Sequence, residues 1–245
     1  MKIKQYIPNF LTTMNLFCGL LSIIMIMNGN FIWSGLFIVI AAVFDYLDGT
    51  AARLLKAYSE LGKQLDSLAD VVSFGVAPGI LIFKMLYAGC ATGCNILEQM
   101  HITPYFALLI PVCSALRLAK FNIDLRQEEN FIGLPVPANA MFFASIPLIL
   151  YLQPQLFSIL SFDFFIDFFS NTRVLTILVV FFSYMLISDF RIFSMKFKNL
   201  GWKGNQLRYI FLVLSVLLLI LFSLTAIPII IFLYLILSIF LQHLI

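Results

Sequence analysis

Four aspartates stand at short, regular spacings in two neighbouring apolar stretches. Asp45 and Asp48 close the first stretch, and Asp66 and Asp70 open the next. On helices, spacings of three and four residues place each pair on one face. Acids beside apolar segments are costly to bury, so function is the default explanation. Four converging carboxylates repel one another unless cations neutralise them, and oxygen ligands of this kind suit Mg²⁺ or Mn²⁺.

Smaller and basic residues near these acids indicate a phosphate ligand. Four carboxylates are enough to hold two divalent cations, which clamp phosphate oxygens during an in-line displacement. Gly49 and Ala52 would let a bulky phosphate or base approach the backbone, and Arg53 offers a fork of donors for a phosphate oxygen. The alternative is that the acids merely pair with Arg53, Lys56 and Lys63 at the membrane interface. Four acids, two small residues and an arginine at fixed spacing make that alternative the weaker one.

The elements that carry these residues are predicted to be transmembrane helices. Of the 245 residues, 62% are hydrophobic and only 11% are charged, too few polar side chains to coat a soluble globule. The apolar runs are near the length that a helix needs to cross a bilayer. The predicted spans are residues 9–28, 31–52, 68–88, 103–121, 138–153, 173–190, 206–223 and 226–244. We expect an all-α integral membrane protein with about eight transmembrane helices in one polytopic domain, residues 1–245, including additional C-terminal spans over 173–245.

The charges indicate orientation rather than a nucleic-acid partner. The 15 Lys and Arg are balanced too evenly by 12 Asp and Glu for a nucleic-acid binder. With the N-terminus in the cytoplasm, every basic residue lies inside except Lys84 and Arg173. This is a strong positive-inside bias. It predicts a multi-pass protein of the cell (inner) membrane with both termini and the aspartates on the cytoplasmic side.

The acidic segment is similar to a known family signature. The pattern Asp45-x2-Asp48-Gly49-x2-Ala52-Arg53-x8-Gly62-x3-Asp66-x3-Asp70 resembles, without a departure, that of the CDP-alcohol phosphatidyltransferases. The resemblance implies a membrane enzyme that transfers a phosphatidyl group from a CDP-linked lipid to an alcohol and releases CMP. By position, the four aspartates would hold two divalent cations, and Asp70 would also take the proton of the attacking hydroxyl. Gly49, Ala52, Arg53 and Gly62 would line the CDP site. Family analogy also suggests a homodimer.

Further segments look like the bacterial and archaeal phosphatidylserine synthase branch of this family. They are residues 7–12 with Asn15, 65–78, 117–122 and 131–137. This resemblance implies CDP-diacylglycerol and L-serine as substrates. Serine is a zwitterion whose carboxylate needs a cation, and Arg117, Lys120 and Asn122 are expected on the same inner face as the aspartates. They are candidates for serine binding, although Arg117 and Lys120 could equally be positive-inside anchors.

Three alternatives remain open at this point. Another acceptor, such as glycerol 3-phosphate or inositol phosphate, would use the same chemistry but would want a denser basic pocket. A cation transporter would place its acids near the bilayer midplane, often within internal repeats, whereas these acids cluster at the inner ends of two adjacent spans and no repeat is found. A purely structural membrane protein would leave the acidic cluster unexplained.

Overall fold

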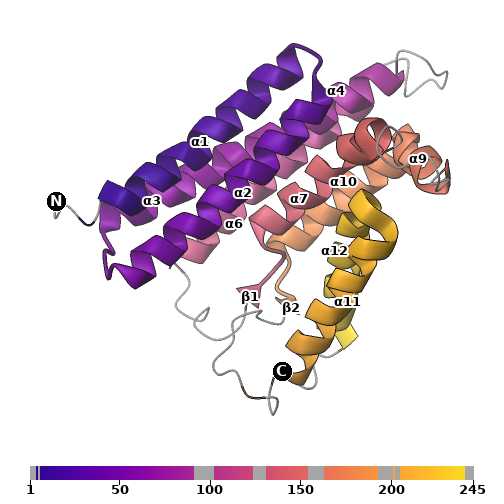
Figure 1. Ribbon diagram of the computed structural model, residues 1–245. Coiled ribbons are helices and arrows are strands. Elements are labelled where there is room, and N and C mark those ends of the chain that lie inside the picture. Colours follow the sequence, from indigo (N-terminus) through magenta and orange to yellow (C-terminus); the bar gives the residue numbers. More distant parts are fainter. Residues whose placement is uncertain are drawn as a thin grey trace.

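The chain opens with two long antiparallel helices. The computed structural model describes residues 4, 6–90, 102–123, 131–153, 163–192, 201 and 205–240. Helices α1 (Tyr6–Met27) and α2 (Phe31–Leu54) are joined by a tight turn in which Gly29 has a φ of +74°. Asn30 caps α2, since its side-chain oxygen accepts a hydrogen bond from the Trp33 amide at 3.3 Å. This hairpin sets α2 beside α1 along its length (Figure 1).

The third long helix changes its winding in the middle. Helix α3 (Glu60–Asp70), the π-helical segment η2 (Val71–Val76) and α4 (Ala77–Cys90) follow one another without a break. Ser59 caps the start of α3, where its hydroxyl accepts a hydrogen bond from the Gly62 amide at 3.0 Å. A π-helical segment is rare and is frequently found at functional sites. Here it begins immediately after Asp70.

The middle of the chain adds shorter and bent helices. The 3₁₀ segment η3 (Thr103–Leu108) leads into α6 (Leu109–Ile123), and α7 (Val136–Pro147) continues as the π-helical segment η5 (Leu148–Leu152). Helix α9 (Asp163–Ser170) lies within the predicted connection 154–172 and meets α10 (Thr172–Ile187) at a bend of 75°. The two-residue strands β1 (Phe131–Ile132) and β2 (Arg191–Ile192) pair antiparallel.

The last two helices form a hairpin. Helix α11 (Gln206–Phe222) ends at the short η6 turn (Ser223–Thr225), and α12 (Ala226–Phe240) follows. The rings of Phe211 and Tyr234 have centroids 5.7 Å apart, whereas a continuous helix would separate them by about 35 Å. The chain therefore folds back at Ser223, where φ is 52°. The Thr225 amide donates to the Gln153 side-chain oxygen at 3.1 Å, which fixes the hairpin to the end of η5.

Two apolar clusters hold the helices together. One is rich in phenylalanine and includes Phe142 and Phe182, whose stacked rings have centroids 4.0 Å apart. The other surrounds Phe74 of η2 and includes Ile38 of α2 and Ala140 of α7. Because lipid is as apolar as these side chains, close packing drives the association of membrane helices. Phe74 of this second cluster lies one helical turn after Asp70, so the cluster packs next to the acidic segment.

The expectation of an all-α membrane protein is confirmed, apart from the two very short strands. The described helices cover all eight predicted ranges in whole or in large part. Five described stretches are long and apolar enough to cross a membrane, and the bent α9–α10 pair makes a sixth. One of the five, Gln206–Ile239, is the α11–α12 hairpin, while Val136–Leu152 is shorter than a usual span. The count of eight spans stays a prediction.

Candidate metal and nucleotide site

Three of the four aspartates meet where α2 ends and α3 begins. Figure 1 shows this junction at the same end of the molecule as the start of α1. Asp45, Asp48 and Asp66 each offer a carboxylate oxygen, and these oxygens all lie within 4.8 Å of one another. The convergence of carboxylates expected from the sequence is thus observed for these three residues. We call them the acidic cluster.

The acidic cluster has the chemistry of a metal site. Asp48 is only 5% exposed, and its Oδ2 atom and the Oδ1 atom of Asp66 are buried without a hydrogen-bond partner among the described residues. Arg53 does not neutralise them, because its Nε atom donates to the Gly49 carbonyl at 3.1 Å and its terminal nitrogen to the Thr50 hydroxyl at 3.3 Å. Orphaned carboxylate oxygens so close together fit a hard divalent cation.

Asp70 lies one helical turn beyond Asp66, on the buried side of the acidic cluster. It is outside the group of three, although the charges of Asp45, Asp66 and Asp48 act on it. Its Oδ1 atom accepts a hydrogen bond from the Asn15 side-chain amide at 3.2 Å. The four predicted aspartates therefore form one constellation in which Asp70 has a different partner from the others.

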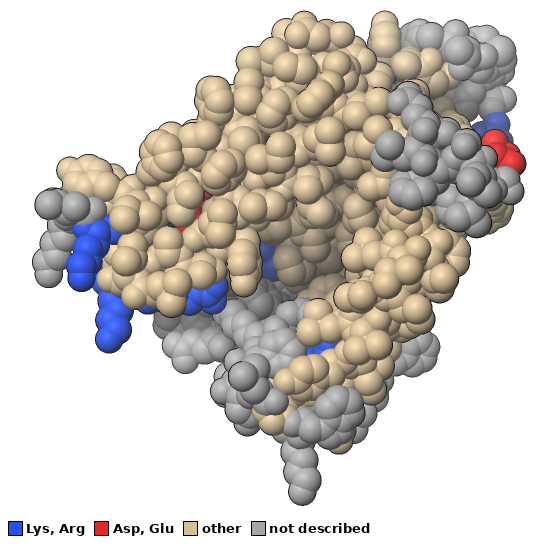
Figure 2. Space-filling model, viewed as in Figure 1, with Lys and Arg blue, Asp and Glu red and all other residues tan. Residues whose placement is uncertain are grey.

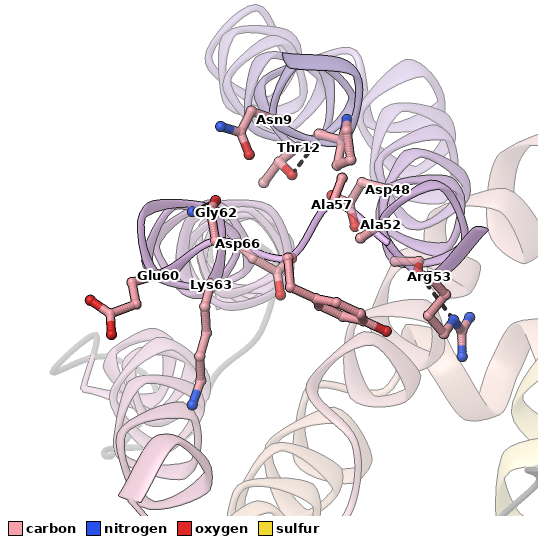
Figure 3. Close-up of a pocket in the computed structure, with 14 residues that line it drawn as sticks. Asn9, Thr12, Asp48, Ala52, Arg53, Ala57, Glu60, Gly62, Lys63 and Asp66 are labelled. Atoms are coloured by element: carbon pink, nitrogen blue, oxygen red, sulfur yellow. Dashed lines mark hydrogen bonds between the residues drawn. The ribbon is translucent and has the colours of Figure 1, made fainter. Parts of the chain in front are cut away.

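A cavity of about 820 Å³ opens beside the acidic cluster. Asp48 and Asp66 turn toward the space between α2 and α3, whereas Glu60 points outward (Figure 3). The cavity is also lined by the four residues that the family resemblance places at a CDP site: Gly49, Ala52, Arg53 and Gly62. A volume of this size suits a nucleotide headgroup or a drug-sized ligand.

Gly62 occupies a position where a side chain would collide. A Cβ atom there would lie 2.9 Å from the Asn9 side-chain oxygen and 2.9 Å from the Ser59 hydroxyl. At Gly49, by contrast, a Cβ atom would meet nothing within 4 Å, so this glycine borders open space. The absence of a side chain at Gly62 lets α3 pack closely against α1. Its absence at Gly49 leaves open space at the cavity wall.

Helix α1 supplies a wall that the sequence analysis did not assign. Asn9 and Thr12 line the cavity, and Figure 3 shows them on the α1 side of Asp48 and Asp66. Together with Asn15, they recur every three residues along a mainly apolar helix. That polar stripe on one helical face was the available signal, because membrane helices turn such residues toward the protein interior.

The three candidate serine-binding residues have different surroundings. Arg117 is 7% exposed, donates to the Gly133 carbonyl at 3.4 Å and has Asp70 and Tyr234 as electrostatic partners. The Lys120 side chain is 61% exposed and pairs with Asp189 at 3.6 Å. Asn122 donates its side-chain amide to the Ser67 hydroxyl at 2.9 Å. Of the three, Arg117 is the residue associated with Asp70.

Comparisons with known proteins point in the same direction as the site. Residues 5–185 match the model of the CDP-alcohol phosphatidyltransferase family. A CDP-diacylglycerol–serine O-phosphatidyltransferase of Bacillus subtilis is 38% identical over 141 residues, which are 56% of this chain and 72% of that protein. A protein of the same name from Helicobacter pylori is 36% identical over 55% of this chain and 54% of its own length. An archaetidylserine synthase of Methanothermobacter thermautotrophicus is 35% identical, over 59% of each protein.

Proposed function

Because the chain belongs to the CDP-alcohol phosphatidyltransferase family, we propose that it transfers the phosphatidyl group of CDP-diacylglycerol to L-serine, forming phosphatidylserine and CMP. The observation that carries this proposal is the acidic cluster at the wall of a nucleotide-sized cavity. The names of the relatives support serine as the acceptor. The chain spans about half the length of several of these relatives, so serine as the acceptor is a proposal for experiment to test.

Each part of the constellation has a role in the proposed reaction. Asp45, Asp48, Asp66 and Asp70 would hold two divalent cations, Mg²⁺ or Mn²⁺, which would supply positive charge to neutralise the pyrophosphate of the lipid and the departing CMP. Gly49, Ala52 and Gly62 leave room for the CDP group against the backbone, and Arg53 stabilises the negative charge on the phosphate of CMP.

Asp70 acts as the general base. It accepts the proton of the serine hydroxyl while the serine oxygen forms a bond to the phosphorus atom that carries diacylglycerol. The bond from that phosphorus to the bridging oxygen breaks, and its electron pair leaves with CMP. The proton stays on Asp70 until it passes to solvent. The buried position of Asp70 beside Asn15 keeps the carboxylate in place for this transfer.

Arg117 is the residue best placed to bind the serine carboxylate. Its Nε atom is buried without a hydrogen-bond partner, and no described carboxylate forms an ion pair with it. A buried guanidinium without an ion-pair partner is costly, and a ligand carboxylate would provide one. Ser114, one helical turn earlier on α6, also has a buried hydroxyl without a partner among the described residues. Lys120 and Asn122 stay secondary candidates.

The decisive experiment supplies purified protein with CDP-diacylglycerol and Mg²⁺ or Mn²⁺. Parallel reactions contain L-serine, glycerol 3-phosphate or inositol phosphate, and mass spectrometry identifies the lipid formed while CMP is quantified. We expect phosphatidylserine and equimolar CMP, both abolished by excess chelator. Product only with a phosphorylated acceptor would reject serine, and full turnover in chelator, with no metal retained by the protein, would reject the metal site. The homodimer and the cytoplasmic orientation of the site remain part of this proposal.

A further inference from the structure

Asn15 joins α1 to the segment that carries Asp70. Its side-chain amide donates to Asp70 Oδ1 at 3.2 Å, and its backbone carbonyl accepts a hydrogen bond from the Ser73 hydroxyl at 3.0 Å. Asn15 is fully buried. One turn later, a Cβ atom at Gly19 would lie 2.8 Å from the Ser73 Cα atom, so only glycine permits this approach. Helix α1 is therefore fixed against η2, the π-helical segment that follows Asp70.

Of the two polar atoms of the Asn15 side chain, only the nitrogen forms a hydrogen bond with a described residue. Its Oδ1 atom is buried and has no hydrogen-bond partner among the described residues. An unsatisfied buried polar atom is costly, so the one bond that this amide makes contributes to holding it in place. That bond goes to the carboxylate of Asp70. It ties one oxygen of this carboxylate to α1.

An amide is suited to holding a general base. A hydrogen bond from a neutral N–H to a carboxylate is strong and directional. Unlike Lys or Arg, asparagine brings no positive charge that would make the carboxylate a weaker base. With Oδ1 held by Asn15, the carboxylate cannot rotate freely, and its other oxygen keeps a fixed direction. Fixing a reactive group before the substrate arrives lowers the barrier to the reaction.

We propose that Asn15 is a positioning residue that fixes the Asp70 carboxylate for proton transfer from the acceptor hydroxyl. The inference rests on the proposed function because it takes Asp70 as the base. It adds a residue of α1 that lies outside the acidic signature, and it explains why α1 approaches η2 so closely.

The test compares two changes at the same helix junction. Asn15→Ala removes the donor to Asp70, and Asn15→Asp keeps the shape of the side chain but has no N–H to donate. Ser73→Ala is the matched control, because it removes the neighbouring hydrogen bond to the Asn15 backbone and leaves the bond to Asp70 intact. For each protein, kcat and both KM values are measured per folded molecule, together with Mn²⁺ binding in the absence of lipid and the melting temperature.

A positioning role predicts a separation of these quantities. Asn15→Ala should lower kcat by about 10- to 100-fold, with the KM for CDP-diacylglycerol and the Mn²⁺ affinity changed by less than about threefold. Asn15→Asp should lose at least as much activity, and Ser73→Ala should keep kcat within about threefold of wild type. An unchanged kcat in Asn15→Ala would overturn the inference. So would a loss shared equally by Ser73→Ala, or failure of both Asn15 variants to fold while Ser73→Ala folds.

A wrong assignment of serine as the acceptor can be told apart from a wrong role for Asn15. If the wild-type protein makes no phosphatidylserine but releases CMP with another alcohol, the serine assignment is wrong. The same variants are then compared on that alcohol, because Asn15 acts on the base rather than on the rest of the acceptor.

Discussion

At the residue scale, Asp66 and Asp70 are one helical turn apart but have different partners. Asp66 belongs to the acidic cluster and has a buried oxygen without a hydrogen-bond partner among the described residues. Asp70 lies deeper and is bound by Asn15. The same side chain can therefore serve mainly as a cation ligand at one position and as a base at the other.

This difference predicts distinct responses to asparagine, which keeps the shape of aspartate but removes its charge. Asp48→Asn and Asp66→Asn should weaken Mn²⁺ binding, and added metal should restore part of their turnover. Asp70→Asn should keep much of the CDP-lipid binding but lose turnover by about 10²- to 10⁴-fold at saturating metal. Metal titrations of CMP release check this. If added metal rescues Asp70→Asn as fully as the other two, Asp70 is a ligand only.

The buried guanidinium of Arg117 leads to a prediction about the acceptor. Arg117→Ala should raise the KM for serine by about 10- to 100-fold, because a hydrogen bond to a charged group contributes about 1.5–3 kcal/mol. The KM for CDP-diacylglycerol should change little. Lys84→Ala, an exposed change on α4, is the control. Equal increases in both KM values would show that Arg117 supports the fold of the site rather than serine.

At the element scale, the closeness of α3 to α1 determines one wall of the cavity. Gly62→Ala would place a Cβ atom 2.9 Å from the Asn9 side-chain oxygen, so α3 or Asn9 must shift. Overpacking of this kind typically costs about 1–3 kcal/mol of stability. We expect a lower melting temperature and a several-fold higher KM for CDP-diacylglycerol. Leu61→Ala, at the exposed neighbouring position, is the control and should change the KM little.

The acidic signature was predictable from sequence because helical spacing fixes which side chains share a face. Asp45, Asp48 and Asp66 met as expected once a short connection reversed the chain. The partner of Asp70 was not predictable, since Asn15 is 55 residues away and its contact depends on how α1 packs. Nor does apolar composition distinguish a π-helical segment such as η2 from an α-helix, because hydropathy carries no information on hydrogen-bond register.

At the scale of the whole molecule, basic side chains gather at one end. The Lys63 ammonium donates to the Asn122 carbonyl at 3.5 Å, so the start of α3 and the end of α6 lie together. Figure 2 shows Lys and Arg side chains gathered at the end where α1 starts and α2 ends, with others in the middle of this face and near α11, and an acidic side chain next to a basic one at the far end, near α9. The acidic cluster opens at the basic end. The positive-inside rule predicts that this end faces the cytoplasm.

Cysteine accessibility in intact cells tests this orientation. Cys18 and Cys113 are buried, so the background needs only Cys90 and Cys94 replaced by serine before single cysteines are introduced. An impermeant maleimide should label Asp163→Cys, at the start of α9, in intact cells, because that end of the molecule is predicted to face outward. It should label Lys63→Cys only after the membrane is permeabilised, since a charged reagent does not cross about 30 Å of hydrocarbon. Equal labelling of both after permeabilisation is the control for reactivity. Labelling of Lys63→Cys in intact cells would place the cavity on the outer side. The orientation predicted from the positive-inside bias would then be wrong.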